Sequence, residues 1–279
     1  HKLKENEFSY ETLSILHEKV FTTNLINYFL ETEQDIDKAL NIFIRINSGG
    51  EPLDFSDLLM SIAVANWTQK DARTEIFKLI DEIRDNGFFI NKDFVLKVFL
   101  LLHSNNIKFK VTNFSAENAK DFELKWDNIR AAICSTFDLI KTFGYTESTL
   151  TSKNALIPII YYIYHRNIYT DFDTRKCYEQ DRKIIRQWLN IVLVKRIFGG
   201  QADNILTAIR GVFTEDVTKN AIDGSINLFP KNLIVDRLKG TTKDMTMDDD
   251  YIDNLLLTQK DNGLAFSILS LLYPNLDYK

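Results

Sequence analysis

Two stretches of helical periodicity meet at Arg45-Ile46-Asn47-Ser48-Gly49-Gly50. Apolar residues recur at helical spacing on both sides of this segment, up to Ile44 and again from Leu58. Asn and Gly adopt left-handed backbone angles at low cost, so the first helix is expected to end here. Pro52 then fixes the direction of the chain, and Asp54 or Ser56 is suited to cap the next helix. The segment therefore predicts a helix, a tight corner and a second helix.

Two interpretations of this corner remain open. Backbone N–H groups at a glycine turn, and at the start of the helix that follows it, bind anions such as phosphate. Glycine is also common in plain helix–helix corners, and the residue chemistry alone favours the plain corner. No Gly-Lys-Ser or Gly-Lys-Thr triplet occurs in the sequence, so the corner is not a P-loop.

Composition and periodicity together predict a mainly α protein, an irregular multi-helix bundle. The 279 residues are 45% hydrophobic and 12% aromatic, with ten Gly and four Pro, which is typical of a globular chain with a sizeable core. We expect at most a few short strands, near the N-terminus (Val20–Leu30) and near 107–111. A Ser/Thr-rich run after Gly144 divides the helices into two parts, 1–145 and 146–279.

The helical pattern can be followed over most of the chain. Pro158 is expected to kink its helix or to begin it late, and Gly87, Gly144 and Gly199-Gly200 are expected to close helices. The predicted helices are Phe8–Lys19, Asp35–Arg45, Asp54–Trp67, Asp71–Asp85, Lys92–Ser104, Ser115–Phe143, Ser152–His165, Asp173–Phe198, Ala202–Phe213, Lys231–Leu238, Asp249–Leu257 and Leu264–Leu272.

Charge, cysteine content and apolar run length restrict the partners and the cellular location expected for the protein. A net charge of −5 argues against a surface that coats nucleic acid generally. Cys134 and Cys177 are isolated and have neither metal-binding nor redox spacing, which indicates a reducing, cytoplasmic location. The longest apolar runs are shorter than a membrane span, so no membrane partner is expected.

One helix combines an apolar face with a basic face. Between Arg175 and Phe198 there are seven basic and two acidic residues. At helical periodicity Arg175, Arg182, Arg186 and Arg196 fall on one stripe, opposite the apolar residues. Arginine pairs well with phosphate, so the stripe is a candidate contact with the DNA backbone. The alternative is an ordinary solvated face, which most such charge runs are.

Other polar and aromatic residues favour structural roles. Asp244, Asp248–Asp250 and Asp253 lack the spacing of a calcium loop and are better explained as helix caps. The three tryptophans lie within apolar helical patterns and are expected in the core. His103 and His165 each end an apolar run, where an interaction with the helix dipole is the simpler explanation.

The corner and its flanks resemble the hallmark sequence of a bacterial family of uncharacterised domains. The pattern is Phe43-x-Arg45-Ile46-Asn47-Ser48-Gly49-Gly50-x-x-Leu53-x-x-x-Asp57-Leu58. It is similar to a segment of GmrSD-type, modification-dependent restriction enzymes and related anti-phage defence systems. Weaker similarities to the family extend over Asn154–Tyr162, Phe198–Gly200 and Ala265–Pro274.

The resemblance implies a three-part architecture. A ParB/sulfiredoxin-like α/β domain with an Asp-Gly-Gln-Gln-Arg motif, linked to nucleotide hydrolysis or nuclease action, precedes a helical region. An HNH nuclease domain with an Asp-His-Ile-Phe-Pro motif often follows it. Neither motif occurs in this sequence, and Ile226-Asn227 stands where Asp-His would precede Leu228-Phe229-Pro230. We therefore expect the chain to be the central helical scaffold of a longer DNA-targeting nuclease, with no catalytic residue or metal site of its own.

The same resemblance indicates partners and a site. The intact protein would be a nucleotide-dependent DNA endonuclease that uses a nucleoside triphosphate and Mg²⁺, whereas this segment alone would hold no cofactor and be inactive. DNA and the flanking nucleotide-dependent and HNH domains would be its partners. The motif residues, structural or adjacent to a nucleotide or DNA site, are Arg45, Asn47, Ser48, Gly49, Gly50, Leu53 and Asp57. The alternative is a non-enzymatic helical module for protein interaction.

Overall fold

The structure is a computed structural model of the chain. It describes residues 7–23, 55–103, 116–200, 202–217 and 228–274, with the single positions 30, 32, 33 and 42. The chain divides into two compact units, His1–Glu51 and Pro52–Lys279. The predicted corner at 45–50, Leu53, and the strand expected near 107–111 lie outside the described residues. So does the helix predicted over Asp35–Arg45, apart from Ile42.

The first unit is described at helix α1 (Glu7–His17) and the π-helical turn η1 (Glu18–Thr22). The helix predicted over Phe8–Lys19 is confirmed. The strand expected to begin at Val20 is wrong over Val20–Thr22, because these residues continue the helical path and Thr23 is the first extended one. The side chains of Val20 and Phe21, which suggested a strand, are exposed on this turn.

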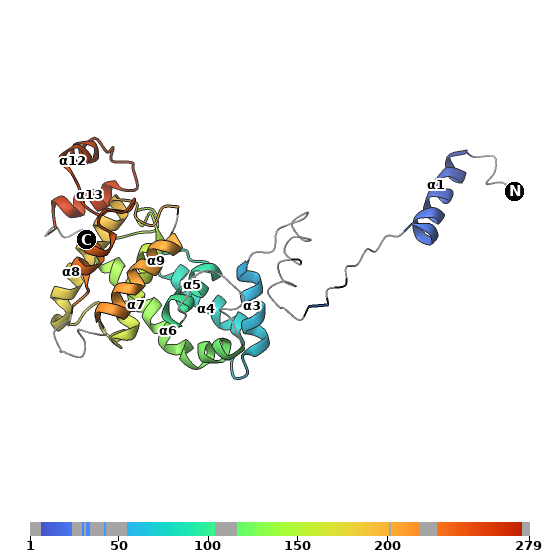
Figure 1. The fold of residues 1–279 in the computed structure, drawn as a ribbon, viewed down its shortest axis with the longest axis horizontal. Coiled ribbons are helices and arrows are strands. Elements are labelled where there is room, and N and C mark those ends of the chain that lie inside the picture. Colours follow the sequence, from blue (N-terminus) through green and yellow to red (C-terminus); the bar gives the residue numbers. More distant parts are fainter. Residues whose placement is uncertain are drawn as a thin grey trace. The chain divides into compact units, whose positions relative to one another are not determined.

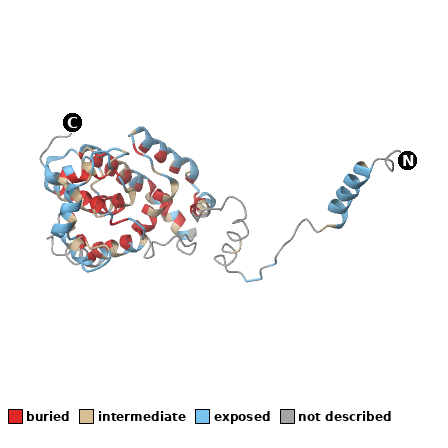
Figure 2. Ribbon diagram, turned by 90° about the horizontal axis from the view of Figure 1, so that it is seen from above, coloured by how far each residue is buried: buried red, intermediate tan, exposed pale blue. Residues whose placement is uncertain are grey.

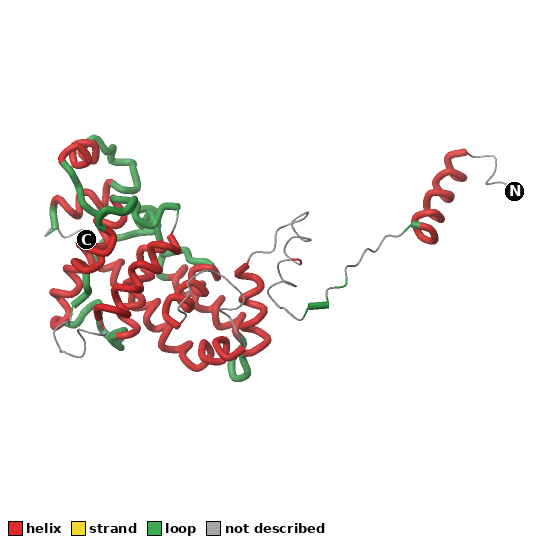
Figure 3. The backbone as a smooth tube through the Cα atoms, in the orientation of Figure 1, coloured by secondary structure: helices red, strands yellow, loops and turns green. Residues whose placement is uncertain are grey.

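The second unit is a bundle of helices, and no strand occurs in the described ranges of the chain (Figures 1 and 3). The predicted mainly α, multi-helix fold is confirmed. The helices are α3 (Phe55–Asn66), α4 (Ala72–Asp85), α5 (Lys92–His103), α6 (Ala116–Thr142), α7 (Ile157–His165), α8 (Glu179–Val194), α9 (Ala202–Gly211), α11 (Lys231–Leu238), α12 (Asp249–Leu256) and α13 (Ala265–Leu272). Short 3-10 turns, η3 (Lys153–Leu156) and η4 (Lys176–Tyr178), precede α7 and α8, and the π-helical η5 (Val212–Val217) extends α9.

Local signals set most of these helix boundaries. The carboxylate of Asp71 accepts the amide of Thr74 at 2.6 Å and caps α4. Pro158 occupies the first turn of α7, so this helix begins late, after η3. Gly87 and Gly144 follow α4 and α6 with φ of 96° and 86°, a region that side chains disfavour.

The core of the second unit is aromatic and continuous. Buried faces of successive helices point toward one another in Figure 2. Trp126 of α6 and Trp188 of α8 are fully buried, and Trp67 after α3 is 7% exposed, so the core position predicted for all three tryptophans is confirmed. One apolar cluster runs from Leu59 to Met245. The division expected between residues 145 and 146 falls inside this unit.

One long helix is shorter than its sequence pattern suggested. A helix was expected over Asp173–Phe198, but α8 begins at Glu179 and ends at Val194. Asp171 and Arg196, on either side of it, have φ of 59° and 49°, so neither can continue a right-handed helix. Among the described residues no helix is both long and apolar enough to cross a membrane.

Candidate nucleic-acid interface

Of the family-motif residues, Asp57 is the one whose surroundings the structure describes. It lies in the first turn of α3 and forms an ion pair with Lys92, the first residue of α5. This pair joins the starts of two helices of the second unit. The other motif residues, Arg45, Asn47, Ser48, Gly49, Gly50 and Leu53, are outside the described residues.

The four arginines of the predicted stripe have different environments. Arg182 and Arg186 lie on α8 and are half-buried, whereas Arg175 precedes η4 and Arg196 follows α8, and both are exposed. Arg175 and Arg196 flank α8, whose 16 residues span roughly 24 Å. The structure therefore places two exposed arginines at opposite ends of α8, with the other two partly enclosed between them.

Arg182 holds the segment that leads into α8. One of its terminal nitrogens, Nη1, donates to the carbonyl oxygens of Phe172 at 2.9 Å and Arg175 at 2.7 Å. These carbonyls belong to the irregular segment before η4, and that of Arg175 also accepts the backbone amide of Tyr178 at 3.1 Å. Arg182 thus has a structural role that the helical pattern did not reveal.

We predict that Arg182→Ala lowers the free energy of unfolding by about 1–2 kcal/mol, because two backbone acceptors lose a charged donor. The control is Arg175→Ala, which removes an exposed side chain three residues after Phe172. It should change the free energy of unfolding by less than about 0.5 kcal/mol. Urea denaturation of both variants measures the difference. Equal stabilities would show that the two contacts of Arg182 contribute nothing.

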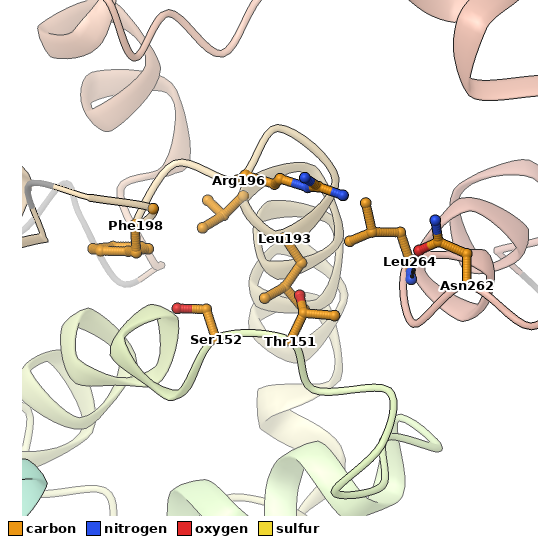
Figure 4. Close-up of a pocket in the computed structure, with 9 residues that line it drawn as sticks. Thr151, Ser152, Leu193, Arg196, Phe198, Asn262 and Leu264 are labelled. Carbon is orange, nitrogen blue, oxygen red and sulfur yellow. Dashed lines mark hydrogen bonds between the residues drawn. The ribbon is translucent and has the colours of Figure 1, made fainter. Parts of the chain in front are cut away.

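A cavity of about 360 Å³ opens beside Arg196. Figure 4 shows Thr151 and Ser152 on one side of it and the Arg196 side chain on the other, extending toward Leu264. Its apolar part comes from the end of α8 and from Phe198. Its shape is that of a small cleft with one cation and several hydroxyl and amide groups at the rim, which suits a polar or anionic group of a ligand.

Two buried carboxylates were missed by the sequence analysis. Asp181 of α8, 2% exposed, accepts the Tyr162 hydroxyl at 2.7 Å and the amide of Phe229 at 2.8 Å. Burial raises the pKa of Asp181 above its ordinary value, although both hydrogen bonds oppose that shift. The two contacts join α8 to α7 and to the segment before α11.

Glu123 of α6 is the second buried carboxylate and is 7% exposed. It accepts the backbone amides of three successive residues in the turn after α3, with distances of 3.0 Å to Thr68 and 2.8 Å to Lys70. Burial acts to raise the pKa of Glu123, but the backbone donors outweigh it and lower the pKa below 4.5. The carboxylate therefore clamps the turn between α3 and α4.

One histidine and one aspartate for which the sequence favoured structural roles lie at helix ends. His103 lies in the last turn of α5, where the sequence placed it, and its interaction with the helix dipole stays a prediction. Burial, followed by the charge of Lys125, lowers the pKa of His103 to about 4. Its ring packs edge-on against Tyr164, with centroids 5.6 Å apart. Asp248 caps α12 by accepting the amide of Tyr251 at 2.8 Å, so the predicted capping role is confirmed there.

The model of the N-terminal domain of the GmrSD restriction endonuclease matches residues 1–64. The matched region includes the corner at Arg45–Gly50 and extends through Asp57 into α3. The match supports a restriction-system protein of GmrSD type. No curated protein matches the chain.

Proposed function

We propose that this chain is a helical scaffold within a DNA-targeting restriction endonuclease and that it contacts the DNA backbone through the arginines around α8. The observation that carries the proposal is the match of residues 1–64 to the GmrSD N-terminal domain. A restriction endonuclease acts on DNA, and the basic residues near α8 supply cations of the kind that DNA phosphates bind. In this proposal the segment is the central helical part, and catalytic motifs lie in flanking domains.

Cofactors enter this proposal only through the intact protein. The resemblance implies a nucleoside triphosphate and Mg²⁺, but among the described residues no group of three or more His, Cys, Asp or Glu is placed to share a metal ion. A cytoplasmic location is part of the proposal, consistent with the free thiols of Cys134 and Cys177.

DNA binding by the exposed arginines is testable without disturbing Arg182. We expect Arg175→Glu/Arg196→Glu to weaken binding of a DNA duplex by about tenfold at low salt, and to reduce the dependence of log affinity on log salt concentration by about two. Fluorescence anisotropy across a salt series measures both quantities. We also expect the chain to cleave no DNA with Mg²⁺ and a nucleoside triphosphate present.

The matched control is charge reversal elsewhere on the same unit. Arg73 of α4 is also exposed, so Arg73→Glu changes the net charge without touching α8. If Arg73→Glu and Arg175→Glu lose the same DNA affinity, the loss comes from the change in net charge and not from a contact at α8. Unchanged DNA affinity and salt slope in Arg175→Glu/Arg196→Glu would contradict the proposed interface. DNA cleavage by the chain that a substitution within it abolishes would contradict the scaffold assignment.

The second candidate is a helical module for protein interaction. The observation that favours it is the exposed apolar surface of α1 and η1, where Phe8 and Phe21 are 77% and 76% exposed. The coding sequence on either side of this segment distinguishes the two functions. Asp-Gly-Gln-Gln-Arg upstream and Asp-His-x-Phe-Pro downstream support the nuclease scaffold, and unrelated flanking sequence supports the interaction module.

A further inference from the structure

A second cavity, of about 410 Å³, lies between α8 and α13 and reaches the first residue of α11. Helices α8 and α13 pack against each other in the second unit (Figure 1). The α8 residues that line the cavity form one continuous helical face, with spacings of three and four residues. The lining residues are Lys183, Arg186, Gln187, Asn190, Ile191, Lys231, Ser270, Leu271 and Pro274.

The charged lining of this cavity is entirely cationic. Lys183, Arg186 and Lys231 contribute positive groups, and no carboxylate belongs to the lining. Lys231 donates to Gln187 at 3.1 Å, and Arg186 donates to the carbonyl oxygen of Pro274 at 3.4 Å. Lys183 forms an exposed pair with Glu179, one turn earlier on α8, at 2.8 Å. Exposed pairs of this type are weak, so Lys183 can exchange this partner for an anion in the cavity. Three cations around a concave surface attract an anion more strongly than a flat face does.

The wall contributed by α13 holds a buried hydroxyl group. Ser270 is 1% exposed, and its Oγ has no hydrogen-bond partner within the described part of the chain. A buried hydroxyl that makes no hydrogen bond is unfavourable for stability. Ser270 lines the cavity, so an oxygen-rich ligand there would supply the missing acceptor.

Asn190 adds a second neutral donor, and a hydrogen bond from Tyr145 holds its side-chain amide in place. Its Oδ1 accepts the hydroxyl of Tyr145, and the Oγ of Ser267 lies 3.1 Å from the same hydroxyl. All three residues are buried. With its oxygen occupied, Asn190 has its NH₂ group left to donate. The cavity therefore offers cations and neutral donors together.

We propose that the cavity between α8 and α13 binds a phosphate group, held by Lys183, Arg186 and Lys231 and by the donors of Asn190 and Ser270. A phosphate carries several acceptor oxygens and a negative charge, which matches this set of groups. The phosphate belongs either to a DNA backbone or to a free nucleotide. The DNA source rests on the proposed function, whereas phosphate binding itself does not.

The first experiment uses inorganic phosphate with the full chain, at constant ionic strength set with chloride. Thermal unfolding should show a rise in Tm with phosphate beyond that produced by chloride, and titration calorimetry should give the Kd. We expect Lys183→Ala/Lys231→Ala to raise that Kd by at least tenfold. The control Lys78→Ala/Lys125→Ala removes two other helical lysines that are paired with carboxylates and should leave it unchanged.

Ser270→Ala separates ligand binding from a structural role. Because the variant removes an unpaired buried hydroxyl, the unliganded chain should keep its Tm or gain stability, while the Kd for phosphate rises several-fold. A lower Tm without phosphate, and an unchanged Kd, would assign the hydroxyl to folding and overturn its role in the site. No effect of phosphate beyond chloride on the unmodified chain would overturn the whole proposal.

A second experiment distinguishes the two sources of phosphate. A short DNA duplex and a nucleoside triphosphate are titrated separately against the chain and the Lys183→Ala/Lys231→Ala variant. Loss of duplex binding in this variant supports a backbone phosphate, and loss of nucleotide binding supports a nucleotide. Duplex binding that depends on Arg175 and Arg196 but not on the two lysines would leave the proposed function intact and overturn the DNA arm of this proposal.

Discussion

Trp126→Ala should lower the free energy of unfolding of the chain by about 3–5 kcal/mol. The indole ring is fully buried in α6 and meets Trp67 edge-on at 5.6 Å and Phe122 at 5.4 Å. Its Nε1 donates to Glu75 of α4 at 3.1 Å. The substitution removes this hydrogen bond and leaves a cavity at the point where three helices meet. Chemical denaturation followed by circular dichroism measures the loss.

An exposed aromatic residue provides the control for the loss of stability in Trp126→Ala. Phe77 of α4 is 46% exposed, so Phe77→Ala should change stability by less than about 0.5 kcal/mol. Trp126→Phe, which restores much of the buried volume, should recover most of the lost stability. Similar losses in Phe77→Ala and Trp126→Ala would show that the core is not centred on Trp126.

Glu123→Ala should be the second most damaging change, with a loss of about 2 kcal/mol. The substitution leaves the amides of Thr68, Gln69 and Lys70 without their shared acceptor. Glu123→Gln keeps one oxygen that accepts hydrogen bonds and should cost less, because the geometry survives while the charge is lost. Denaturation of the two variants at neutral pH gives the comparison.

The same carboxylate makes the stability of the protein sensitive to acid. Its pKa in the folded chain is lowered below 4.5, so its contribution is complete above that value and declines as the pH falls through the folded pKa. The unmodified chain should therefore lose more stability between about pH 5 and pH 3 than Glu123→Gln does. Parallel acid dependences for the two chains would contradict a clamp that depends on charge.

Helix positions could be predicted from the sequence because their signals are local. The helix predicted from Asp71 is α4, which Asp71 caps, and Gly87 follows that helix with the positive φ that glycine tolerates. The limits of α8 could not be predicted. The amphipathic pattern continues beyond the helix, and the chain leaves it where Arg182 bonds the carbonyls of Phe172 and Arg175 instead of facing solvent.

The candidate site was predictable only in part, for a related reason. An excess of arginine around α8 is visible in the sequence, and the structure separates its members into exposed and bonded ones. Ser270 has no sequence signal, because a serine in an apolar helix becomes informative only once α8 is known to lie beside it. Glu123 is similar, since its bonded partner Lys70 is 53 residues away along the chain.

The position of α3 affects how proteins of this kind are divided for experiments. The region that matches the GmrSD N-terminal domain stops at residue 64, yet α3 continues to Asn66. Leu59 and Ala63 are fully buried in the cluster that contains Trp126. The limit of evolutionary similarity is therefore not a limit of independent folding. An expression fragment truncated at residue 64 would separate α3 from the side chains that shield it from water, and the remainder would lose the first helix of its bundle.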